Sequence, residues 1–260
     1  MNKNIIVIFV LIILIIIGGV TYKMNIFNKR TLDLEENRNE VTSKQYERRN
    51  KNNEFIKKQG IKCYEDLSLV ESSADVKMKT LDEIANRAFT CFISIQIACD
   101  INNNNYEESV EYFKPILEKL NLSPYLNSKE KRIVDGTYTM QDAIDLDWEY
   151  EDLWSLFYAV GLVDDITDGG KLCDCDFIIK TMSSCKNVKE FKDKCQLRDI
   201  EEILDMIDLY YRYHWACIEK RVNPETNIAN LNPSNVLERR RGLEWLISNE
   251  DDWYDISLNA

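Results

Sequence analysis

Four charged residues in the C-terminal third of the chain recur at a helical spacing. They are Glu201, Asp205, Asp208 and Arg212. Side chains separated by three or four residues lie on one stripe of an α-helix. Three carboxylates beside an arginine can bind a cation, orient a polar substrate or form ion pairs with neighbouring helices. The stripe is therefore a candidate binding site, and an ion-pair ladder beside a buried helix face is its simplest interpretation.

Two further charged residues, Glu238 and Arg239, are additional binding candidates near the C-terminus. Together with the stripe they could hold a metal ion or a polar substrate, which is the arrangement an enzyme would need. Arg239 and Arg87 are also the basic side chains that we expect to pair with the stripe. The same residues thus support two hypotheses, one functional and one structural.

The chain contains a single histidine, His214, so a mechanism that needs an imidazole base or ligand must use it. On an α-helix this residue lies far around the axis from Asp208, which disfavours a joint metal site on that helix. We expect a partly buried histidine that is held by a hydrogen bond.

Eight cysteines are present, and two of them, Cys173 and Cys175, are separated by one residue. Zinc knuckles use a two-residue gap and a second matching pair, and neither is found. The sequence also lacks a glycine-rich phosphate loop, a nucleophile elbow and a paired-histidine motif. We therefore expect neither a metal nor a cofactor, and a non-enzymatic role is favoured.

These residues need helices to position them, and helix start signals are frequent after residue 79. Capping residues predict helices that begin after Thr80, Asn105, Thr139, about residue 198 and Asn232, the last with a proline in its first turn. Apolar residues within these segments recur every three or four positions. The predicted fold class is all-α, with a loop over 164–176, two short helices after it and a small extended element at 136–139.

Residues 5–20 are all apolar or glycine, and Thr21 and Tyr22 extend this uncharged run to the length that begins to span a bilayer. A cleaved secretory signal is the alternative, although Gly19, Val20 and Thr21 offer only a poor cleavage site. We expect a single-pass cell-membrane protein with a tail at 1–4, an anchor at 5–22, a charged stalk at 23–59 and a multi-helix domain at 60–260. Its expected partners are the lipid bilayer, through 5–22, and an unidentified protein.

The charge distribution bears on topology and on partners. One lysine precedes the anchor, whereas Lys23, Lys29 and Arg30 follow it, which favours a cytoplasmic C-terminal domain. Unpaired cysteines in a chain of this size also suit a reducing compartment. With 45 acidic and 33 basic residues the net charge is −12, so we expect no nucleic-acid partner.

Several blocks of the sequence resemble a bacterial family catalogued as domain of unknown function 4272. The most specific block comprises Arg198, Glu201 to Asp205, Asp208-Leu209, Tyr211-Arg212 and His214 to Ala216. The C-terminal block comprises Glu238-Arg239, Leu243, Trp245-Leu246, Trp253, Asp255 and Ile256, and earlier blocks include Glu83 to Ala85 and Trp148 to Glu151. The resemblance covers roughly residues 60–260. It implies a soluble, mostly helical domain with no established activity, and the anchor departs from the family pattern.

Two functions remain open from the sequence. The first is a membrane-tethered helical binding or regulatory module, of the kind that immunity proteins use, because an anchor and a charged segment precede a domain without a recognisable catalytic set. The alternative is an enzyme that depends on a metal or a polar substrate held by the acidic stripe. A structure discriminates between them, because an enzyme requires the carboxylates to converge in a concave pocket.

Overall fold

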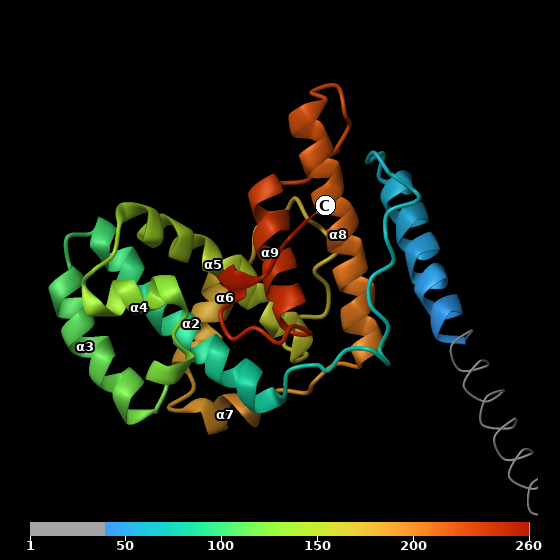
Figure 1. Ribbon diagram of the computed structural model, residues 1–260. Helices are drawn as coiled ribbons and strands as arrows, with labels where there is room; N and C mark the ends of the chain where they lie inside the picture. The colour runs from blue at the N-terminus through green and yellow to red at the C-terminus, as the bar shows by residue number, and fades with distance from the viewer. Residues whose placement is uncertain (1–39, 260) are drawn as a thin grey trace, which may run out of the picture. The chain divides into compact units, whose positions relative to one another are not determined.

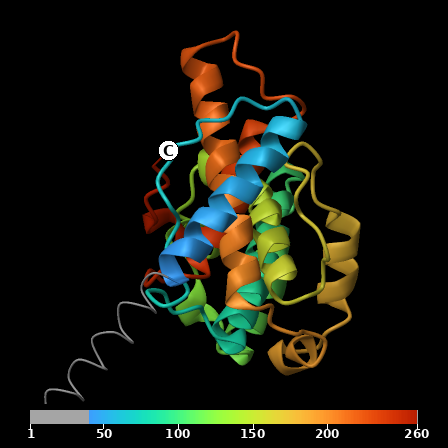
Figure 2. The ribbon, with the colours of Figure 1, turned by 90° about the vertical axis from the view of Figure 1, so that its right-hand side faces the viewer.

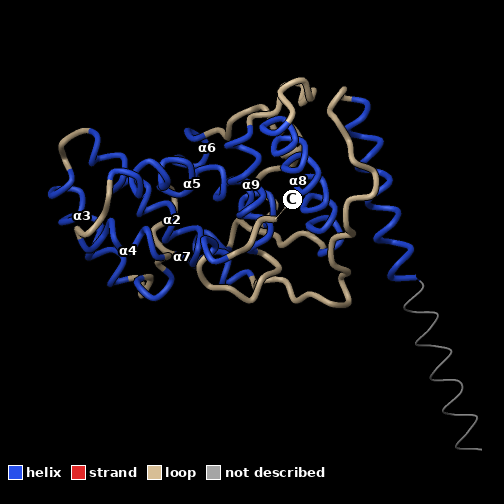
Figure 3. The backbone as a smooth tube through the Cα atoms, turned by 45° about the horizontal axis from the view of Figure 1, so that its top comes forward, coloured by secondary structure: helices blue, strands red, loops and turns tan. Residues whose placement is uncertain are grey.

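The computed structural model describes residues 40–259, and throughout this range the chain forms helices, turns and loops with no strand (Figure 1, Figure 3). The predicted all-α fold class is confirmed. The predicted tail and anchor, residues 1–4 and 5–22, lie outside the described residues. The chain divides into two compact units, Met1–Tyr46 and Glu47–Ala260, and the second holds the helical domain.

Helix α2, Leu81–Asn102, is largely buried in the core of the domain. Thr80 and Glu83 form the predicted capping box, in which each side chain accepts from the other residue's backbone N–H. Within the described residues α2 is also the one helix long and apolar enough to cross a membrane, but 72% of its apolar window is buried inside the domain. Burial of that kind is typical of a core helix.

Helices α5, Met140–Ala159, and α9, Pro233–Trp245, pack against each other beside α2 (Figure 1). Both begin where the sequence predicts, α5 at a capping box of Thr139 with Asp142 and α9 at Asn232 followed by proline. The two backbones approach closely at Gly242, where a Cβ atom would come within 2.7 Å of the Asp152 carbonyl oxygen. A larger residue at this position would push the helices apart.

The remaining helices pack around this core. They are α3 (Tyr106–Lys119), α4 (Ser128–Asp135), α6 (Cys175–Ser183), α7 (Val188–Lys192) and the 3₁₀ turns η1 (Ser123–Tyr125) and η2 (Trp253–Asp255). Helix α4 is not among the predicted helices, although Asn127 and Glu130 form a capping box at its start. The extended element expected at 136–139 is absent, because these residues make the short turn between α4 and α5.

Helix α8, Ile200–Val222, carries the acidic stripe. It packs against α9 on one side, and Tyr210 and Tyr213 are fully buried between α8 and the 160–174 loop, whose carbonyls accept from both hydroxyls. Asp199 caps its first turn and Asn223 follows its last. The predicted limits of this helix are therefore confirmed to within two residues.

Residues 47–58 are helical and lie along α8, although the sequence predicts a solvated stalk up to residue 59 (Figure 2). Ile56 is 1% exposed, and Arg48 and Asn52 are also buried. The compact unit therefore begins at Glu47 and not near residue 60. The physical reason is that this helix packs on α8 mainly through polar side chains. A search for periodic apolar residues does not detect such a helix, because it does not identify the hydrogen-bond partners on α8.

Candidate functional site

The inner half of the acidic stripe forms a buried ion pair on α8. Arg212 donates from Nε to Asp208 Oδ2 over 2.8 Å and from Nη2 to Asp208 Oδ1 over 2.7 Å. Both residues are 1% exposed. A bidentate pair one helical turn apart is geometrically specific, and its loss would leave a buried charge without a partner.

Two amides of the 47–58 helix complete this pair. Asn52 Nδ2 donates to Asp208 Oδ2 over 2.8 Å, and Asn53 Oδ1 accepts from Arg212 Nη1 over 3.0 Å. Asn52 also donates to the Asp205 carbonyl over 2.9 Å. These contacts satisfy polar atoms that burial has removed from water, so the two helices stabilise each other.

The outer half of the stripe is half-exposed and pairs with the same helix. Arg48 donates from Nη2 to Glu201 over 2.6 Å and from Nε to Asp205 over 3.2 Å. Lys51 donates to the other Asp205 oxygen over 2.6 Å. The stripe is thus an ion-pair ladder, but its basic partners come from residues 47–58 and not from Arg87 or Arg239. The expectation of those two partners is wrong.

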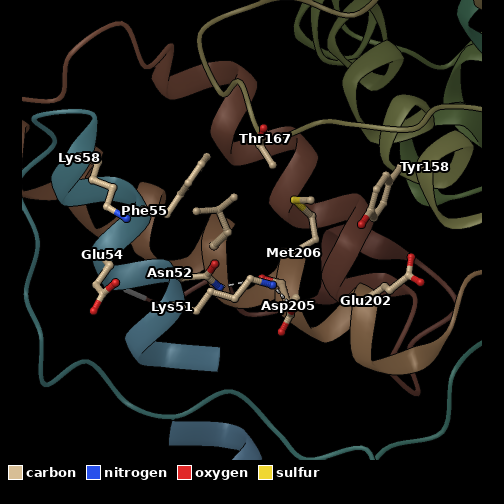
Figure 4. A pocket seen from close by; sticks show the side chains of 11 residues that line it. Lys51, Asn52, Glu54, Phe55, Lys58, Tyr158, Thr167, Glu202, Asp205 and Met206 are labelled. Carbon is tan, nitrogen blue, oxygen red and sulfur yellow. Dashed lines mark hydrogen bonds and ion pairs between the residues drawn. The ribbon is translucent and has the colours of Figure 1, made fainter. Parts of the chain in front are cut away.

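A cleft of about 510 Å³ opens beside this ladder, between the 47–58 helix, α8, the end of α5 and the 160–174 loop (Figure 4). Its apolar lining includes Phe55, Met206, Leu209 and the ring of Tyr158. Its polar lining is Lys51, Asn52, Glu54, Lys58, Thr167, Glu202 and Asp205. The volume lies within the range of pockets that hold small ligands or single anchoring side chains.

The charges around the cleft are of mixed sign. Asp205 is ion-paired with Lys51, and Glu202 with Arg198 over 3.0 Å. Lys58 and Glu54 have no ion pair within the part of the chain that the structure describes, so both remain free to meet a ligand. An apolar lining with one free cation and one free anion suits a ligand that buries an apolar group and carries polar atoms around it.

The single histidine does not reach the cleft. His214 Nδ1 lies 2.6 Å from Arg240 Nη1, and because a guanidinium only donates, the ring nitrogen must accept. Burial, helped by the charges of Arg240 and Arg221, lowers the pKa of His214 to about 4. The predicted hydrogen bond is confirmed, the ring is buried and not only partly buried as expected, and the imidazole is neutral at neutral pH.

The last two candidates, Glu238 and Arg239, lie on α9 and do not join the stripe. Arg239 Nε donates to Glu151 Oε2 over 2.8 Å, and its other nitrogens donate to the carbonyls of Asp168 and Lys171 over 3.0 and 2.7 Å. This buried arginine therefore anchors the 160–174 loop to the core. Glu238 pairs with Arg241 on its own helix.

Within the described residues, one group is close enough to hold a metal ion, namely Cys91, Glu130 and Glu149. All three side chains are buried. Glu130 already pairs with the Arg87 guanidinium, and Glu149 Oε1 accepts from Asn127 and Tyr254 at 2.9 Å each. With the acceptor oxygens occupied and an arginine supplying the positive charge, this group is a buried polar network in the core.

Sequence reasoning missed two sets of residues. One set lines the cleft from α5, the 160–174 loop and α8, namely Tyr158, Thr167, Glu202, Met206 and Leu209. The other comes from the segment expected to be a stalk, namely Arg48, Lys51, Asn52, Asn53, Glu54, Phe55 and Lys58. One signal was available, because Arg48, Asn52 and Ile56 are spaced by four residues and form a single helix face. This face was not recognised as buried because two of its three residues are polar, and polar groups are buried only where they have partners elsewhere in the chain.

Comparison with protein families gives a match that covers both the 47–58 helix from Arg48 onward and helix α8. The family model described as Domain of unknown function (DUF4272) matches residues 48–256. The chain belongs to this family. The DUF4272 match begins at Arg48, the first residue of the ion-pair ladder, so it includes the helix that lines the cleft. The search of curated proteins and the search of solved structures each found no match.

Proposed function

We propose that this DUF4272 protein is a membrane-tethered binding module, and that the cleft between residues 47–58 and α8 receives an anchoring side chain of a partner protein. The observation that carries the proposal is the cleft itself, which combines an apolar lining with Lys58 and Glu54, two charged residues that form no ion pair with any residue in the range 40–259. Interfaces gain most of their affinity from an apolar anchor that fills such a pocket.

The polar groups around the cleft support binding more than catalysis. The stripe carboxylates are already occupied by Arg48, Lys51 and Arg212. A metal ion or a general base would need a carboxylate that is free of such cations. The alternative of a metal- or polar-substrate-dependent enzyme has less support for this reason.

The tether is the second part of the proposal. Residues 5–22 are mainly apolar, contain no charged residue and are followed by the basic residues Lys23, Lys29 and Arg30. We infer from this pattern a single-pass anchor with the domain on the cytoplasmic side.

A photo-crosslinking experiment tests the cleft. Phe55 is replaced by a photoreactive phenylalanine analogue in the full chain, which is then irradiated in native membranes. Phe55 lines the cleft and is 38% exposed, so the analogue keeps the aromatic ring where a ligand would contact it. We expect a discrete crosslinked protein, and its yield should fall at least tenfold when Thr167→Arg fills the cleft.

The matched control carries the same analogue at Tyr125, another exposed aromatic residue that lies on η1 and away from the cleft. This position should give no discrete adduct. Equal adducts from both positions, or none from position 55 in membranes where the protein is intact, would overturn the proposal.

A further inference from the structure

Cys173 and Cys175 place their sulfur atoms 3.6 Å apart at the junction of the 160–174 loop and α6. All eight cysteines are free thiols. Within the described residues no other two thiols lie within hydrogen-bonding distance of each other. The contact is therefore specific to this pair, and it lies outside the cleft of the proposed function.

The two thiols differ in their surroundings in a way that assigns them different roles. Cys175 is exposed and is the first residue of α6, whereas Cys173 is half-buried. The hydrogen bond with Cys173 lowers the pKa of Cys175, against partial burial and the charges of Glu151, Asp174 and Asp176, which raise it. The same hydrogen bond and burial raise the pKa of Cys173. Cys175 is thus the better nucleophile, because the thiolate is the reactive form.

The loop that carries Cys173 is held to the core by a chain of polar contacts. The backbone N–H of Cys173 donates to Glu151 Oε1 over 2.8 Å, while the other oxygen of Glu151 pairs with Arg239. Cys173 is therefore positioned by the buried Glu151–Arg239 pair, which keeps its sulfur beside Cys175. A preorganised neighbour favours intramolecular reaction over reaction with a second molecule.

We propose that Cys173 and Cys175 are a thiol–disulfide exchange site that forms a reversible intramolecular disulfide with a low-molecular-weight disulfide as oxidant. The Cys175 thiolate attacks one sulfur of the oxidant, breaks its S–S bond and releases one thiolate, which takes up a proton. Cys173 then loses its proton, attacks Cys175 Sγ and displaces the second small thiol. Two protein thiols are oxidised to one disulfide, and the small disulfide is reduced to two thiols.

The test uses the purified full chain, fully reduced and then equilibrated with glutathione and glutathione disulfide at graded ratios. Free thiols are alkylated in acid-quenched samples, and the mass of the tryptic peptide of residues 172–180 is measured by mass spectrometry. We expect this peptide to escape alkylation and to lose the mass of two hydrogens as the buffer becomes oxidising. A reductant should restore both alkylated cysteines.

Variants separate the two steps. With Cys173→Ser, Cys175 should accumulate as a mixed disulfide with glutathione, because the resolving thiol is missing. With Cys175→Ser, the reaction of Cys173 should slow at least tenfold, since Cys173 is half-buried, and burial and the charge of Glu151 still raise its pKa in the variant. Cys63→Ser is the matched control and should leave the peptide of residues 172–180 unchanged.

Two outcomes would overturn the proposal. One is a native chain in which both thiols stay alkylatable across all glutathione ratios. The other is stable glutathionylation of a single cysteine without an internal disulfide, which would show an accessible thiol that its neighbour does not resolve. Neither outcome affects the proposed cleft, which the crosslinking experiment tests separately.

Discussion

At the scale of single residues, the buried Asp208–Arg212 pair is the most sensitive part of the stripe. Arg212→Ala would leave Asp208 charged and buried, which costs about 3 to 5 kcal/mol. At roughly 2 to 4 °C per kcal/mol for a domain of this size, the melting temperature should fall by about 6 to 20 °C. Thermal unfolding followed by circular dichroism measures the change.

The matched control is Asp205→Asn, whose side chain is 34% exposed. One of its partners, Lys51, is exposed, and the other, the buried Arg48, keeps its ion pair with Glu201. The effect of this substitution on the free energy of unfolding should be about 1 kcal/mol or less. If both substitutions left stability unchanged and abolished binding of a partner or ligand, the structural role of the stripe would be refuted and an enzymatic site would gain support.

Asp152 is a fully buried carboxylate with no hydrogen bond to either side-chain oxygen in the described structure, and its nearest ion-pair partner, Arg241, lies 3.8 Å away. Burial raises its pKa from 3.8 to about 7. Between those values the folded chain keeps a proton that the unfolded chain loses, so stability falls as pH rises through this window. The loss is up to about 4 kcal/mol.

Asp152→Asn should remove this loss. Urea unfolding at pH 4 and pH 7.5 provides the measurement. The free energy of unfolding of the variant minus that of the native chain should be larger at pH 7.5 than at pH 4. A stability difference between the two chains that does not change with pH would contradict the assignment.

His214 produces the opposite pH dependence. Its folded pKa of about 4 lies below the ordinary value of 6.5, so the unfolded chain binds the extra proton between these values. Stability is complete above pH 6.5 and is lost as pH falls, by up to about 3 kcal/mol at pH 4. His214→Gln cannot take up that proton, so the variant should lose less stability than the native chain between pH 6.5 and pH 4. Guanidinium unfolding at both pH values distinguishes the two chains.

At the scale of elements, the 47–58 helix determines whether the stripe is buried. A chain that begins at residue 60 lacks Ile56 and both amides that complete the Asp208–Arg212 pair. Burial of an isoleucine contributes about 1.5 to 3 kcal/mol and each hydrogen bond about 1 kcal/mol. We therefore expect a chain of residues 60–260 to be helical but at least about 3 kcal/mol less stable than residues 47–260. Equal urea midpoints would show that the helix is dispensable.

At the scale of the whole molecule, topology is the property that the function most depends on. If the domain faces the cytoplasm, a membrane-impermeant thiol reagent should not modify Cys175 in intact cells kept under reducing conditions. After lysis the reagent should label it, because Cys175 is exposed. The peptide of residues 172–180 reports both results, and labelling before lysis would reverse the orientation.

Local patterns in the sequence determined the positions of most helices. Thr80 with Glu83, Thr139 with Asp142, and Asn232 before proline place helix starts where the structure has them, because a cap and its first turn are neighbours along the chain. The family could also be assigned from short blocks of residues, and the family match confirms it.

Only the tertiary structure decided where the candidate site lies. Asn52 and Asp208 are 156 positions apart, and each alone looks like an ordinary solvated polar residue. The stripe was visible in the sequence, whereas its basic partners, the cleft beside it and the separation of Glu238 and Arg239 from it were not. A polar residue is recognised as buried only when its hydrogen-bond partners are known, and here those partners come from the opposite end of the domain.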